Sequence, residues 1–144
     1  MGMDFLGRRG GSFALNWTAM GHVMNMLHER GVVDLHAGPG PLPTTVRHEF
    51  LYPRPDGDPE EAAAYHWKSQ TSPNPTLVPC YKFNSNDGWI VTPAECLVIA
   101  DALDSFLLGQ LPGVSALELL WLQRVGELAS FNRRCAGEDG YEVW

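Results

Sequence analysis

Cysteine is scarce in this chain of 144 residues, which has three cysteines and no CxxC spacing. An odd number of thiols without that spacing favours reduced cysteines over a secreted disulfide framework. Charged residues are also few, at 19%, while 44% of the residues are hydrophobic, so the chain is not of the disordered class. We therefore expect one folded core that needs neither a disulfide nor a metal ion.

Positive charge is in deficit, with 10 Lys and Arg against 17 Asp and Glu and a net charge of -7. Such a surface repels phosphate backbones and anionic lipids, so we expect no nucleic-acid partner and no membrane partner. No apolar run is long enough to span a bilayer, and the Met1-Gly2-Met3-Asp4 opening lacks the charged and apolar regions of a secretory signal. These absences predict a cytoplasmic protein.

Proline divides the chain unevenly, because nine of the eleven prolines lie between Pro39 and Pro79. Proline disrupts long helices and central strands, so residues 36–79 are predicted to be a Pro-rich loop region. Neither half of the chain alone would be long enough for a good core. The chain is therefore expected to be a single domain covering residues 1–144.

Short elements are still expected inside the Pro-rich region. Alternation of residue types over Thr44–Leu51 predicts a strand, and the next stretch, Arg54–Glu61, is predicted to be an acidic exposed loop. Ala62–Lys68 is expected to add a helical turn or two, and a second polar loop follows.

Three helices are predicted from apolar residues spaced three and four apart. The first runs from Asn16 or Trp17 to about Arg30, the second from a Thr92 cap to Leu108, and the third from a Ser115 cap to near Gly137. The inward-facing residues are predicted to be Trp17, Met20, Met24 and Leu27 in the first helix, Cys96, Ile99, Ala100, Leu103, Phe106 and Leu107 in the second, and Leu117, Leu120, Trp121, Val125, Leu128 and Phe131 in the third.

Strands are expected at Met3–Leu6, Thr76–Phe83, Gly88–Val91 and the last few residues. The Asn86-Asp87-Gly88 turn between the second and third of these predicts an antiparallel hairpin. Strands and helices do not alternate strictly, which indicates an α+β fold: a small antiparallel or mixed sheet covered on one face by three helices.

Several short motifs recur in a known group of proteins. These are the Met1-Gly2-Met3-Asp4 opening, the Asn16-Trp17 helix start, the Asn-Asp-Gly turn before a Thr-capped helix containing Ala-Asp-Ala-Leu, and the Gly140-Tyr141-Glu142-Val143-Trp144 ending. With them the chain resembles a widespread group of small bacterial and phage proteins that end in a Gly-Phe-Glu-Ile-like strand. The resemblance covers about half of the chain and implies a shared fold plan in a bacterial protein. It assigns no activity, cofactor or site residue.

Metal binding is the first chemistry to test, because five histidines are present. His22 and His28 lie six residues apart on the first helix, whereas paired helical zinc ligands lie four apart. A calcium loop aligned on Gly88 would place Phe83 at its first ligand position, where an aspartate is needed. We therefore expect no metal site and no cofactor.

Nucleophilic and acid–base chemistry has equally little support. Cys96 lies in the first turn of a capped helix, but Glu95 opposes a thiolate there and the position continues the apolar stripe. No GxSxG motif is present, and Asp101, Asp104 and Glu118 are typical of solvated helix faces. Catalytic residues are left unassigned.

The basic, glycine-rich segment Gly7-Arg8-Arg9-Gly10-Gly11-Ser12 lies ahead of the first helix. Backbone amides, two guanidinium groups and a helix N-terminus could together hold an anionic group through Arg8, Arg9 and Ser12. The segment lacks the Lys-Ser/Thr ending of a P-loop and the GxGxxG spacing of a dinucleotide site. A plain connecting loop is the favoured interpretation, and an anion site is the alternative.

Two functions remain. The first is a binding or interaction module for a small molecule or a protein, with Trp67 and Trp144 as candidate contact residues and a homodimer through a sheet edge or helix face as one arrangement. The alternative is a small enzyme for a polar or anionic metabolite. Its site would collect dispersed residues: Arg8, Arg9, His22, Asn25, His66 and Asp87. A cleft with three or more of these would favour the enzyme, and their dispersal would favour the module.

Overall fold

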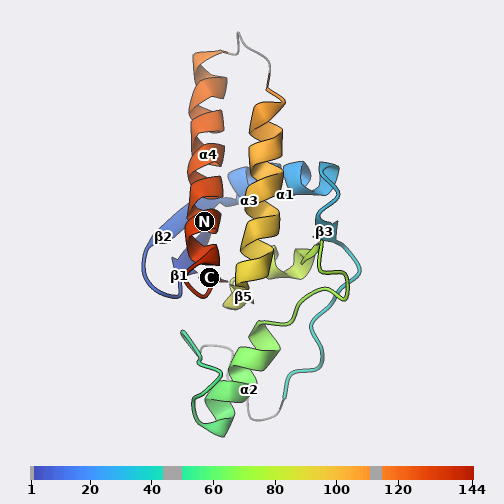
Figure 1. Cartoon of the computed structure of the whole chain (residues 1–144), viewed down its shortest axis with the longest axis vertical. Helices are drawn as coiled ribbons and strands as arrows, with labels where there is room; N and C mark the ends of the chain where they lie inside the picture. The colour runs from blue at the N-terminus through green and yellow to red at the C-terminus, as the bar shows by residue number, and fades with distance from the viewer. Residues whose placement is uncertain (1, 44–49, 111–114) are drawn as a thin grey trace.

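The computed structural model describes residues 2–43, 50–110 and 115–144 (Figure 1). Within these residues the chain forms the predicted α+β fold, with a four-stranded antiparallel sheet, a two-stranded parallel sheet and four α-helices. In chain order the elements are β1 (Gly2–Gly7), β2 (Ser12–Asn16), α1 (Trp17–Glu29), β3 (Val33–Asp34), α2 (Pro59–Lys68), β4 (Val78–Pro79), the 3-10 helix η1 (Cys80–Phe83), β5 (Trp89–Val91), α3 (Pro93–Leu108), α4 (Ala116–Ala136) and β6 (Tyr141–Val143).

The larger sheet has the strand order β2-β1-β6-β5, so its centre joins the first strand of the chain to the last. Phe5 of β1 lies opposite Phe13 of β2 and Val143 of β6, and Tyr141 of β6 lies opposite Val91 of β5. Directly opposed residues of antiparallel strands point to the same face, so these five side chains share one face. All five are buried, which places the main core on this face.

Three helices cover this face. Helices α3 and α4 pack along each other as an antiparallel pair, called here the α3–α4 hairpin, and α1 runs across them (Figure 1). Their predicted starts are confirmed: the side chain of Asn16 accepts a hydrogen bond from Ala19 N at 2.8 Å, and Thr92 forms a reciprocal capping box with Glu95. These caps satisfy amides that would otherwise lack partners at a helix end.

The inward face of the first helix is only partly as predicted. Met20 and Leu27 are buried, but Trp17 is 40% exposed. Trp17 is the first residue of α1 and follows β2 directly, so it lies at the margin of the core rather than above the sheet. The spacing of apolar residues identifies a helix face, but it does not tell where along the helix the cover ends.

The predicted hairpin between residues 76–83 and 88–91 is wrong. β5 pairs with β6, β4 forms a short parallel ladder with β3, and η1 replaces the second half of the expected strand. The Asn86-Asp87-Gly88 turn does precede a strand, and Gly88 has a φ of 76°, but its amide donates to Val143 O at 2.8 Å. The C-terminal strand β6 therefore pairs with β5, in place of residues 76–83, which the turn had suggested as the partner.

A buried lysine occupies the other side of β5. Lys82 of η1 donates through Nζ to Ile90 O at 2.6 Å and forms an ion pair with Glu95 at 2.6 Å. A side chain, rather than a strand backbone, thus satisfies this carbonyl at the sheet edge. Burial lowers the pKa of Lys82, while Glu95 acts in the opposite direction.

The Pro-rich region contains more helix than predicted. α2 begins at Pro59, within the stretch expected to be an exposed loop, because Asp58 caps it by accepting from Glu61 N at 2.8 Å and proline is tolerated at the first helical position. Of the strand expected at Thr44–Leu51, residues 44–49 lie outside the described residues, and Phe50 and Leu51 are not in a strand. β2 and β3 were not predicted.

None of the helices in the described ranges combines the length and the apolar character needed to cross a lipid bilayer. All three cysteines lie within those ranges and are free thiols. Burial raises the pKa of Cys96 far above its ordinary value, which favours the structural interpretation of this residue over a reactive one.

Candidate functional site

A groove of about 810 Å³ lies in the corner between α1 and the α3–α4 hairpin. The residues that line this groove are His22, Asn25, Met26 and Glu29 of α1, Phe106 of α3, and Leu117, Leu120, Trp121 and Arg124 of α4. The contributions of α1 and α4 each follow the spacing i, i+3, i+4, i+7, so each helix presents one continuous face to the groove.

Three of the four residues in the α4 wall of the groove are apolar, and two of these three are largely exposed. Leu117 is 78% exposed and Leu120 is 64% exposed, whereas Trp121 is half-buried and its ring centroid lies 5.9 Å from that of His22. The prediction that the whole α4 stripe faces the core is therefore right for Val125, Leu128 and Phe131 and wrong for its first two members.

The reason for the error is the length of the hairpin. Figure 1 shows the α3–α4 hairpin projecting well beyond α1 and the sheet. The apolar spacing of α4 continues through its first turns, but within the described residues no other element covers them. Two further leucines at this end are exposed outside the groove lining, Leu108 at 88% and Leu119 at 57%. We refer to Leu108, Leu117, Leu119 and Leu120 together as the hairpin tip.

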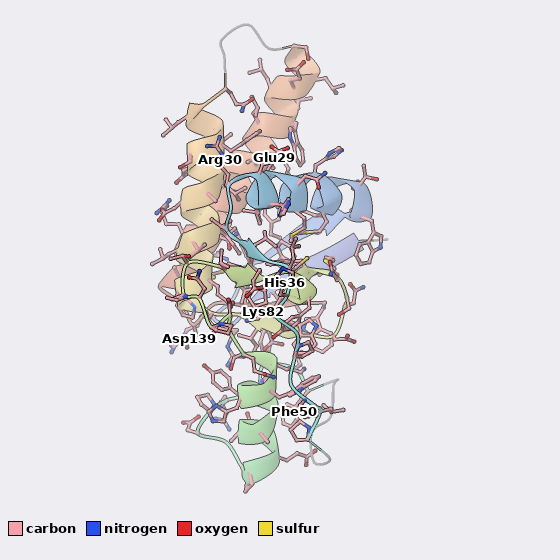
Figure 2. All side chains as sticks on the ribbon, turned by 90° about the vertical axis from the view of Figure 1, so that its right-hand side faces the viewer. Glu29, Arg30, His36, Phe50, Lys82 and Asp139 are labelled. Atoms are coloured by element: carbon pink, nitrogen blue, oxygen red, sulfur yellow. The ribbon has the colours of Figure 1, made fainter. Side chains whose placement is uncertain are left out.

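The α1 wall is polar. His22, Asn25 and Glu29 are exposed, and only Met26 of the lining residues on this helix is buried. Glu29 forms no ion pair with the described part of the chain. Figure 2 shows it near the C-terminal end of α1, on the side toward the projecting end of the hairpin.

Arg124 is the basic residue of the lining, and its guanidinium group is already held. Nη1 forms an ion pair with Glu127 at 3.0 Å, Nη2 donates to Ala14 O at 2.6 Å, and the group lies 3.9 Å from the centre of the Phe13 ring. Of the two charged residues that line the groove, Glu29 is therefore the one that has no ion pair in the described part of the chain, and the exposed Arg30 beside it lines a neighbouring cavity instead.

The predicted anion-binding segment has a different surrounding from the one expected. It links β1 to β2, so the helix N-terminus that was to assist it lies beyond a further strand. Arg8 forms an ion pair with Glu142 at 2.8 Å, donates to Pro53 O at 2.6 Å and lines a cavity of only about 120 Å³. Arg9 forms an exposed ion pair with Asp139 at 2.7 Å.

The seven residues predicted to bind a ligand do not converge on one cleft. His22 and Asn25 line the groove together, while Arg8 lines a different cavity. Ser12 is exposed on β2, His66 is exposed on α2 against the Tyr65 ring, and Asp87 is half-buried in the turn before β5.

The two tryptophans expected to mark a contact patch are not available as such. Trp67 is buried, with its ring centroid 4.6 Å from that of Trp89, and it donates to Gly40 O. Trp144 is half-buried and donates to Glu142 at 3.1 Å.

Leu117 and Leu120 are the exposed apolar residues of the groove instead, although the spacing of apolar residues in the sequence predicted that they face the core. The sequence does contain an indication of this exposure. Leu119 and Leu122 lie on other sides of the same turns, and a helix segment that is apolar on most sides needs more cover than one core can give.

No group of three or more His, Cys, Asp or Glu side chains capable of holding a metal ion occurs in the described ranges. Asp101 and Asp104 both pair with Arg133 on the outer surface of the hairpin, as expected for solvated helix faces.

Comparisons with models of known protein families, with curated proteins and with solved structures found no match.

Proposed function

We propose that this chain is an interaction module that binds another protein at the hairpin tip and the adjoining groove. The observation that carries the proposal is the exposure of the four tip leucines, from 57% to 88%, at one end of a projecting helix pair. Clustered apolar side chains of this kind are a cost in water unless a partner covers them, and such patches commonly mark protein contacts.

The position of the leucines favours a protein over a small molecule. Leu117 and Leu120 line the groove, but Leu108 and Leu119 lie outside its lining, so the apolar surface is larger than the cavity. A partner that packs against both the groove and the tip would cover all four, with Trp121 as the aromatic anchor. The dispersal of the seven predicted polar residues supports a module over an enzyme.

Photo-crosslinking tests this proposal. A benzophenone side chain is introduced in place of Leu120, and in a matched variant in place of Leu97, an α3 leucine that is 46% exposed and lies outside the groove lining. In cells that express the protein we expect a discrete protein adduct from position 120 and none of the same mass from position 97. Similar adducts from both positions would contradict the proposal.

Competition gives the second readout. Excess wild-type protein should abolish the adduct at position 120, whereas the double variant Leu117→Ser, Leu120→Ser should compete at least about tenfold less well, because it removes apolar contacts at the interface centre. Both leucines are largely exposed, so the free energy of unfolding of the variant should differ from that of the wild type by no more than about 0.5 kcal/mol per site. Equal competition by the two proteins would overturn the proposal.

A further inference from the structure

The shape of the groove suits one kind of occupant. Its two long walls are single helix faces, formed by four residues of α1 and four of α4 at helical spacing. A third helix laid into such a corner can pack its own residues at i, i+3 or i+4, and i+7 between the two faces. This inference rests on the proposed function, since it names the partner of the same site.

The charges of the groove indicate which helix would fit. Glu29 is exposed and has no ion pair within the described ranges, and it lies at the C-terminal end of α1, where the helix dipole attracts positive charge. Arg124 is neutralised by Glu127. The whole chain carries a net charge of -7, which attracts a basic partner over longer distances.

We propose that the occupant is an amphipathic helix of another protein, with an apolar stripe against Leu117, Leu120 and Trp121 and a Lys or Arg beside that stripe paired with Glu29. A second copy of this chain is a poorer occupant, because two chains that each carry a net charge of -7 repel each other. The guanidinium group of Arg124, which could have paired with Glu29 of another copy, is held by Glu127, Ala14 O and the Phe13 ring.

Selection from a displayed library of helical peptides tests the inference. The library keeps a fixed helical frame and varies the residues on one face and its two borders. The bait is the full chain, and binders that also bind the Leu117→Ser, Leu120→Ser variant are removed. We expect the remaining peptides to carry large apolar residues at helical spacing and an excess of Lys and Arg at one border.

Charge reversal gives the decisive comparison. Glu29→Lys should weaken the selected basic peptides at least about tenfold and should select acidic borders when used as bait. The matched control is Asp4→Lys, which changes the net charge by the same amount at an exposed position of β1 outside the groove. Asp4→Lys should retain most of the affinity for the selected peptides, and its small loss should disappear at high salt, because salt screens charges that are far from the groove.

Each alternative outcome has a distinct meaning. Groove-dependent peptides without a charge bias, or equal losses in Glu29→Lys and Asp4→Lys, would overturn the assignment to Glu29 and leave the docking function standing. No groove-dependent peptide, together with a positive crosslink at position 120, would overturn the helical occupant alone. Dimerisation in analytical ultracentrifugation that is lost in Leu117→Ser, Leu120→Ser would identify a second copy and overturn the inference.

Discussion

The two faces of the larger sheet are covered in different ways. On one face α1, α3 and α4 bury a continuous apolar core around Phe5 and Leu103. On the other face Glu142, whose side chain is fully buried, meets the segment that leads into α2. Figure 1 shows α2 at the opposite end of the molecule from the projecting hairpin. Apolar packing thus holds one face, whereas on the other buried charges act together with a smaller apolar cluster of Ala64, Trp67 and Trp89.

The polar face is built from side chains that capture a loop backbone. Glu142 accepts from Tyr52 N at 3.2 Å and pairs with Arg8, which donates to Pro53 O. Lys68 of α2 donates to Phe50 O at 2.8 Å and lies 4.7 Å from the centre of the Trp144 ring. Figure 2 shows Phe50 beside α2. Such contacts specify one path for the loop, whereas a buried ion pair adds little net stability over an apolar replacement.

The largest expected effect concerns this polar face. Glu142→Ala should lower the free energy of unfolding by about 3–5 kcal/mol, because it leaves the Arg8 guanidinium buried without its anion. Urea denaturation measures the loss, and the amides of α2 should exchange with solvent faster than those of α3. The double variant Arg8→Met, Glu142→Leu should lose less free energy of unfolding than the sum of the losses in Arg8→Met and in Glu142→Leu. Strict additivity would contradict the coupling.

On the apolar face the expected loss is of similar or slightly smaller size. Leu103 is fully buried, so Leu103→Ala should lower the free energy of unfolding by about 2–5 kcal/mol through lost packing and a residual cavity. Leu97→Ala in the same helix is the matched control, with an expected loss below about 0.5 kcal/mol because the side chain is 46% exposed. Exchange should increase throughout the sheet rather than in α2 alone. If Leu103→Ala increased amide exchange in α2 alone, the two faces would not be separate units.

The smallest expected effect is a pH dependence specific to the polar face. Burial raises the pKa of Glu142 above its ordinary value of 4.5, although hydrogen bonds from Tyr52 and Trp144 and the charges of Arg8 and Lys68 act in the opposite direction. The folded state therefore binds this proton more tightly than the unfolded state. The resulting stabilisation is complete below pH 4.5 and is lost as the pH rises through the raised pKa.

Comparison with a non-titrating side chain isolates this effect. The stability of the wild type relative to Glu142→Gln should decrease as the pH rises from about 4 to about 7, as measured by urea denaturation. The same series with Leu103→Ala should show no such trend, because that substitution leaves all titrating groups of the polar face in place. An increase with pH would show that the ion pair with Arg8 outweighs burial.

The distance along the chain over which residues interact explains which elements could be predicted from the sequence. Helix starts depend on residues three apart, such as Thr92 and Glu95, so they follow from local chemistry. The partner of β5 does not, because residues 76–83 and β6 both supply strand-forming side chains and only the assembled sheet selects between them. α2 was recognisable in part, since Asp58 and Pro59 together form a helix start that the proline content of the region obscured.

The candidate site could be predicted only in fragments. His22 and Asn25 were two of the residues predicted to form a ligand site, and they line the groove together. Leu117 and Leu120 were assigned to the core because apolar spacing alone does not show how far the neighbouring elements extend. The pairing of Arg8 with Glu142 joins residues 134 positions apart in the chain, and no local pattern encodes such a contact.

By itself, the amino-acid sequence determined the α+β class, the limits of α1, α3 and α4, and the turn before β5, because each depends on interactions within a few residues. The tertiary structure alone decided that β6 pairs with β1 and β5, that Glu142 holds the loop before α2, and that the first turns of α4 are uncovered. Those outcomes depend on which distant surfaces meet, and burial of a side chain is a property of the assembled chain rather than of its own segment.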